Sequence, residues 1–112
     1  MNRNKLIDLF ASNLATAIVH QILELAINQQ EYIDKYNKEF KNSWQIASDY
    51  RRKINPVDRL LPDKDTEEIK NIVVNKVNSE LNLRIEKGYK NINLSLVEKF
   101  VHKALKELKI AD

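Results

Sequence analysis

The stretch that decides the fold is residues 1–55, MNRNKLIDLFASNLATAIVHQILELAINQQEYIDKYNKEFKNSWQIASDYRRKIN, which contains neither Gly nor Pro. Apolar residues recur in it every three or four positions, a spacing that predicts helix from end to end. In the first part these residues share one broad arc: Ile7, Phe10, Ala11, Leu14, Ala15, Ile18, Val19, Ile22, Leu25 and Ala26. So wide an arc predicts contact with more than one neighbouring helix.

The second part of this stretch carries a narrower apolar stripe that is rich in aromatic residues. Its members are Tyr32, Ile33, Tyr36, Phe40, Trp44, Ala47, Tyr50 and Ile54. Lysines and other polar residues occupy the opposite side, which is the pattern of a helix that packs along one seam.

The helical phase continues through Asn28–Glu31, so periodicity alone allows one unbroken helix. Such a helix would be roughly 75 Å long, against a diameter of about 35 Å for a compact domain of this size. Two arrangements follow. The chain bends at residues 28–31 into a hairpin, or a second copy covers a straight helix. The mean helix length of about 11–12 residues favours the bend.

Length and composition bound the architecture to one domain, residues 1–112, with 43% apolar residues for a single core. A net charge of +3 permits contact with nucleic acid but does not require it. The absence of Cys excludes disulfides and fits a reducing compartment, so we expect a cytoplasmic protein. Charged and polar residues interrupt the first apolar run, which argues against a membrane span.

After residue 55 a proline should end the long segment. Pro56–Leu61 then reads as one short helical turn that presents Val57, Leu60 and Leu61 to the core.

The next predicted helix begins at Asp65, which stands at capping-box spacing from Glu68, and runs to Lys87. Gly88 supplies a left-handed stop. Alternating apolar residues leave a β-hairpin over Leu81–Leu96 as the alternative.

The last predicted helix begins after Ser95, which forms a second capping box with Glu98. Its apolar face is the clearest local signal in the chain: Leu96, Val97, Phe100, Val101, Ala104, Leu105 and Leu108.

Basic residues offer one functional hypothesis. Lys99, Lys103 and Lys106 share a face of the last helix, and ammonium groups at that spacing could follow a phosphate backbone. Arg51 and Arg52 form a second basic cluster. Lysines opposite an apolar stripe are also what any solvated helix carries, so nucleic-acid binding is the alternative function and not the leading one.

The sequence shows no catalytic motif, and we expect a protein that is not an enzyme and needs no cofactor or metal. His20 with Glu24, and Glu98 with His102, are spaced for metal ligands, but both pairs lie at the polar side of their helices. Surface pairing within each helix is the favoured interpretation. The single Gly excludes a glycine-rich phosphate loop.

The aromatic residues of the second stripe give the leading functional hypothesis. Tyr and Trp are enriched where proteins meet, and a straight first segment would leave them uncovered by the shorter C-terminal helices. The predicted partner interface consists of Tyr32, Tyr36, Phe40, Trp44 and Tyr50.

Together these patterns predict an all-α fold: a three- to four-helix bundle with a long N-terminal helical segment and two C-terminal helices. The expected function is that of a non-enzymatic adaptor, regulator or small subunit, self-associating as a homodimer or joining a larger assembly through residues 32–54. A nucleic-acid-binding helical module is the alternative.

Overall fold

A computed structural model describes residues 2–55 and 59–112 and shows four helices. They are α1 (Arg3–Ala26), α2 (Gln30–Ile54), α3 (Asp63–Glu86) and α4 (Leu96–Glu107). The described residues contain no strand. The prediction of an all-α bundle is therefore confirmed, and the alternative β-hairpin over 81–96 is wrong.

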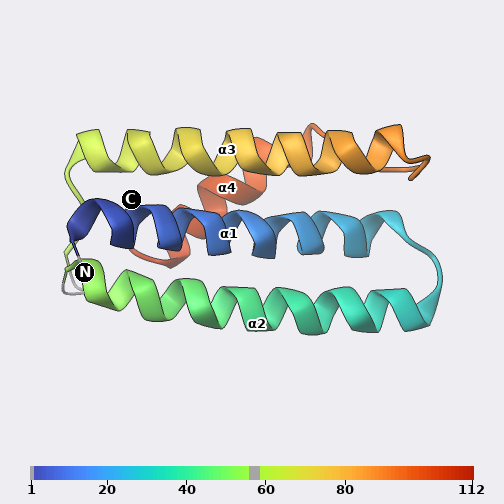
Figure 1. The fold of residues 1–112 in the computed structure, drawn as a ribbon, viewed down its shortest axis with the longest axis horizontal. Helices are drawn as coiled ribbons and strands as arrows, with labels where there is room; N and C mark the ends of the chain where they lie inside the picture. Colours follow the sequence, from blue (N-terminus) through green and yellow to red (C-terminus); the bar gives the residue numbers. More distant parts are fainter. Residues whose placement is uncertain (1, 56–58) are drawn as a thin grey trace.

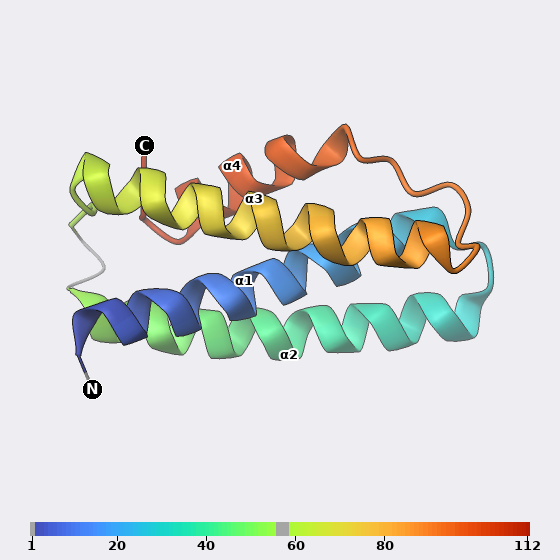
Figure 2. The ribbon, with the colours of Figure 1, turned by 45° about the horizontal axis from the view of Figure 1, so that its top comes forward.

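Helix α1 lies at the centre of the molecule and contacts each of the other three helices. Figure 1 shows α2 and α3 on its two sides and α4 behind it. Figure 2, turned by 45°, shows α4 resting against α3. In the part of the chain that the structure describes, the backbones of α2 and α3 do not lie close to each other. Helices α2 and α3 therefore flank the side of α1 that faces away from α4.

The long N-terminal segment bends, as the length argument favoured. Helix α1 ends at Ala26, Ile27 is extended, and α2 begins at Gln30. Each helix is about 36 Å long at 1.5 Å per residue, which fits the 40 Å longest dimension of the molecule. The hairpin removes the need for a second copy to cover a straight helix.

The core is built mainly on α1, as its broad apolar arc predicts. Eleven of its residues are buried: Leu6, Ile7, Phe10, Ala11, Leu14, Ala15, Ala17, Ile18, Val19, Ile22 and Leu23. By length and composition α1 could also cross a membrane, but 56% of its most apolar window is buried inside the bundle. The other helices bury smaller sets, such as Val97, Val101, Ala104 and Leu105 of α4.

A side chain caps the start of α1 but not the starts of α3 and α4. Asn2 caps α1, and its side-chain oxygen accepts a hydrogen bond from the Lys5 amide at 2.8 Å. The capping box at Asp65 is wrong, because α3 begins two residues earlier and Pro62 holds the N-cap position without a side-chain bond. Asp65 instead forms an ion pair with Arg3.

The connection between α3 and α4 uses Gly88 in the left-handed region, at φ 98°, which confirms its predicted role. The capping box at Ser95 is wrong. The Asn93 side-chain oxygen accepts hydrogen bonds from the Ser95 amide and hydroxyl, at 3.0 and 2.5 Å, and the Ser95 side chain caps nothing. The predicted range of the last helix is nevertheless close to that of α4.

The predicted short turn at Pro56–Leu61 lies partly outside the described residues, at 56–58. In the described remainder Leu61 is buried, as expected, and its amide donates to the Ile110 carbonyl at 3.3 Å. The prediction that Leu60 faces the core is wrong, because its side chain is exposed.

Candidate functional site

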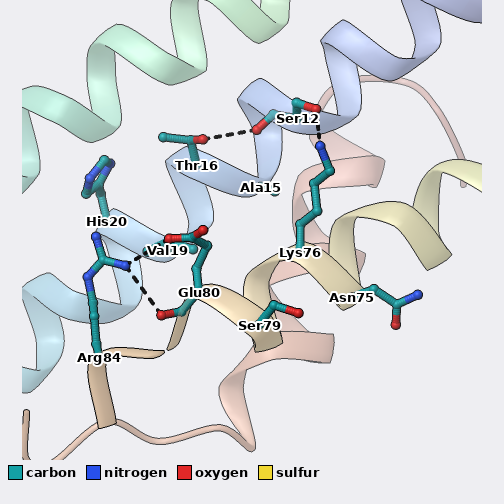
Figure 3. Close-up of a pocket in the computed structure, with 10 residues that line it drawn as sticks. All are labelled: Ser12, Ala15, Thr16, Val19, His20, Asn75, Lys76, Ser79, Glu80 and Arg84. Atoms are coloured by element: carbon teal, nitrogen blue, oxygen red, sulfur yellow. Dashed lines mark hydrogen bonds and ion pairs between the residues drawn. The ribbon is translucent and has the colours of Figure 1, made fainter. Parts of the chain in front are cut away.

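A cleft of about 410 Å³ opens on the side of the bundle where α2 and α3 flank α1. Figure 3 shows its ten lining residues, which come from α1 and α3. Helix α1 contributes Ser12, Ala15, Thr16, Val19 and His20, and α3 contributes Asn75, Lys76, Ser79, Glu80 and Arg84. Hydroxyl, amide and charged groups thus surround two small apolar side chains.

This cleft follows from a polar row on α1. Ser12, Thr16 and His20 recur every fourth residue, so they fall along one line of the helix. The row lies opposite the broad apolar arc and remains on the side that α4 does not cover. Ala15 and Val19, each 3% exposed, lie beside the row and contribute apolar surface.

Lys76 crosses the cleft from α3 to α1. Its ammonium group donates to the Ser12 hydroxyl at 2.5 Å, and the Thr16 hydroxyl donates to the Ser12 carbonyl at 3.1 Å (Figure 3). Among the described residues no carboxylate lies within ion-pair distance of Lys76. Its charge is therefore met in the fold only by a neutral hydroxyl.

Arg84 closes the far end of the cleft and pairs with Glu80 on the preceding turn of α3. The distance from Arg84 Nη1 to Glu80 Oε2 is 3.2 Å (Figure 3). Such an exposed pair contributes little to stability. Its effect is to place one carboxylate and one guanidinium at this end, leaving the Lys76 charge as the uncompensated one.

His20 joins the cleft to α2. Its Nε2 lies 2.9 Å from Glu39 Oε2, and its ring stacks on Tyr36 with 5.9 Å between centroids. The predicted pairing with Glu24 is therefore wrong, since Glu24 instead accepts a hydrogen bond from Asn37 at 3.3 Å. Burial lowers the pKa of His20 below its ordinary 6.5, the Glu39 carboxylate acts in the opposite direction, and Arg84 and Lys35 lower it further.

One atom of His20 has no partner in the described structure. Its Nδ1 is buried and makes no hydrogen bond. The Glu39 carboxylate next to Nε2 favours the hydrogen of the neutral ring on that nitrogen, which leaves the lone pair on Nδ1. A lone pair is less costly to bury there than a second charged N–H would be, which agrees with the lowered pKa.

One residue of the predicted aromatic interface is buried in the monomer, and Phe40, Trp44 and Tyr50 are partly buried. Tyr36 is buried, and Phe40 and Trp44 pack against each other with 5.7 Å between ring centroids. The last two line a small cavity of about 40 Å³ together with Phe100 of α4. Burial raises the pKa of Tyr36, and the neighbouring Tyr89 hydroxyl raises it further.

The other two members of the predicted interface differ in exposure. Tyr50 is half-buried, with the Lys53 ammonium group 5.4 Å from its ring centroid. Tyr32 is exposed and lies near the start of α2. Only this residue of the five has much of its side chain free in the monomer.

The predicted basic residues separate into two groups. Lys99, Lys103 and Lys106 are exposed on α4, and Arg52 is exposed and paired with Asp49. Arg51 is only 1% exposed, so it cannot contact a nucleic-acid backbone. Burial lowers the pKa of Arg51 below its ordinary value.

Sequence reasoning missed both Lys76 and the cleft. The available signal was the fourfold spacing of Ser12, Thr16 and His20, which marks a polar line on an otherwise apolar helix. No group of three or more metal-ligating side chains gathers within the described residues. No family model, curated protein or solved structure matches this chain.

Proposed function

We propose that the protein is a non-enzymatic interaction protein that forms a homodimer through one end of its bundle. The observation that carries this proposal is the placement of its exposed large apolar side chains. Five of them lie at one end of the molecule: Leu25, Tyr32, Leu83, Ile85 and Tyr89. We call this set the apolar end.

The topology gathers these five residues. The end of α1, the start of α2 and the end of α3 all meet at the end of the bundle that holds the α1–α2 turn (Figure 1). Leu25 is 65% exposed and Leu83 49% exposed. Exposed apolar surface that gathers in one place marks sites of protein interaction. Tyr32 belongs both to this surface and to the interface that the sequence predicts.

Charge favours a second copy as the occupant. The first turns of α2 carry Glu31, Asp34 and Lys35, with a net charge of −1, whereas the end of α3 and the following loop carry Glu86, Lys87 and Lys90, with a net charge of +1. A twofold axis that sets the start of α2 against the end of α3 would pair these opposite net charges twice. This pairing favours a second copy of the chain as the partner.

Solution mass tests this proposal. We expect the wild-type chain to be a dimer by light scattering, and Leu25→Glu with Leu83→Glu to make it a monomer with unchanged helix content. Ile46→Glu is the matched control, because Ile46 is 45% exposed but lies in the middle of α2. A wild-type monomer, or equal dissociation by the control variant, would contradict the proposal.

A second candidate function, nucleic-acid binding, is supported by the exposure of Lys99, Lys103 and Lys106 on one face of α4. It predicts an affinity that falls with salt by about one unit of log–log slope per phosphate contact. Charge reversal at Lys103 and Lys106 should then weaken binding to a double-stranded oligonucleotide. Unchanged binding in that double variant would remove this candidate.

A further inference from the structure

We infer that the cleft between α1 and α3 binds a small phosphate ester, with Lys76 as its charged contact. This inference is independent of the proposed dimer, because none of the five residues of the apolar end lines the cleft. The two proposals can therefore fail separately.

The charge of the cleft favours an anion. Lys76 and Arg84 are cationic, Glu80 is anionic and pairs with Arg84, and burial favours the neutral form of His20. One positive charge is left, and it resides on Lys76. An arriving anion would exchange the neutral Ser12 partner for a charged one, and charge-assisted hydrogen bonds are the stronger class.

The polar groups around Lys76 favour phosphate over a simple carboxylate. Ser12, Ser79 and Asn75 line the same cleft and can each donate a hydrogen bond. A phosphate group presents three terminal oxygens, so it can accept from several donors at once. Two helices supply these donors, which gives the anion partners on both sides.

The remaining space favours an ester with an apolar body. A volume of about 410 Å³ lies in the range of small-molecule sites, about 300–1,000 Å³, and an inorganic ion would leave much of it unfilled. Ala15 and Val19 form a nearly buried apolar floor, and the aliphatic stems of Lys76 and Arg84 add apolar surface at the sides, so the hydrocarbon or ring portion of a ligand can pack there. The described side chains thus fit a phosphate group at Lys76 and an apolar group beside α1.

Phenyl phosphate is a suitable probe, with inorganic phosphate and phenol as its two separate halves. We expect phenyl phosphate to bind saturably with a Kd of about 1 mM or tighter. In an NMR titration it should shift the backbone amides of residues 12–20 and 75–84. Inorganic phosphate should bind more weakly by about tenfold, and phenol more weakly still.

The decisive comparison is between two lysine variants of equal charge. Lys76→Gln should weaken phenyl phosphate binding at least about tenfold. Lys103→Gln, at an exposed position of α4, should leave that binding unchanged. Lys76 is exposed, so its substitution should preserve the fold and the dispersed spectrum. Equal effects of the two variants, shifts confined to other residues, phenol binding as tight as phenyl phosphate, or no saturable binding would each overturn the inference.

Discussion

Arg51 donates its Nε hydrogen to the carbonyl oxygen of Leu108 at 2.8 Å, which joins the end of α2 to the end of α4. Its Nη2 donates to the carbonyls of Arg59 and Lys109, at 2.9 and 2.8 Å. Its Nη1 donates to the side chain of Asn55 at 2.5 Å. The charge is therefore satisfied by oxygen dipoles near two helix C-termini, where cations are favoured.

We predict that Arg51→Met lowers the free energy of unfolding by about 3–5 kcal/mol, because the carbonyls of Leu108, Arg59 and Lys109 lose their donor at this partly buried site. Arg51→Lys should lie between this variant and the wild type, since an ammonium group cannot reproduce the planar fork of donors. Urea denaturation followed by circular dichroism measures the free energy of unfolding of each variant. Arg52→Met is the matched control, with a change of less than about 0.5 kcal/mol. Similar losses in the Arg51 and Arg52 variants would show that the buried contacts contribute little.

The turn before α4 gives a second prediction. Asn93→Ala removes the acceptor for both the amide and the hydroxyl of Ser95, and should cost about 1 kcal/mol. Ser95→Ala keeps the amide bond to Asn93 and should cost less than about half as much. Thermal or urea unfolding of the Asn93→Ala and Ser95→Ala variants measures which substitution costs more stability. The reverse order would restore Ser95 as the helix cap that its spacing from Glu98 suggested.

The lowered pKa of His20 predicts how the free energy of unfolding depends on pH. Its pKa is lowered in the folded chain, mainly by burial, so the unfolded chain binds more protons near the ordinary value of 6.5. The stability that the neutral ring contributes is therefore present above pH 6.5 and is lost as the pH falls through 6.5 toward the folded pKa. Urea midpoints between pH 5 and pH 8 should fall on the acid side, and His20→Gln should reduce that fall.

An NMR titration of the imidazole ring provides the direct check. The His20 midpoint should lie below 6.5, with Glu39, Arg84, Lys35 and Tyr36 as its surroundings. Glu39→Gln should lower it further, because the carboxylate is the one neighbour that favours the charged ring. A midpoint above 6.5 would mean that the attraction to Glu39 exceeds the cost of burial, and the slope with pH would then have the opposite sign.

Periodicity was sufficient to predict the helices, whereas the bend between α1 and α2 was favoured only by the length of the first segment relative to the size of a compact domain. The burial of Arg51 was harder to see, since it stands in the run Arg51-Arg52-Lys53 that resembles a solvated basic end. One signal was present: Arg51 follows Ala47 by four residues and so shares its buried face. Spacing alone could not show which carbonyls would receive its hydrogen bonds.

The candidate cleft was beyond sequence reasoning for a related reason. Lys76 and Ser12 are 64 residues apart, and only the packing of α3 beside α1 brings them together. The same holds for His20 and Glu39, which belong to different helices. Spacing within one helix suggested Glu24 as the partner of His20, because rules based on near neighbours cannot see a contact across the hairpin.

The central position of α1 has a consequence for biosynthesis. Helix α1 leaves the ribosome first, and α2 can cover one side of it as soon as residue 54 has emerged. The sides that α3 and α4 cover stay bare until those two helices, which end at Glu86 and Glu107, have been synthesised in turn. At about 5–20 residues per second, the growing chain presents this apolar surface for several seconds. Chaperones that recognise nascent apolar segments would meet the protein in that interval.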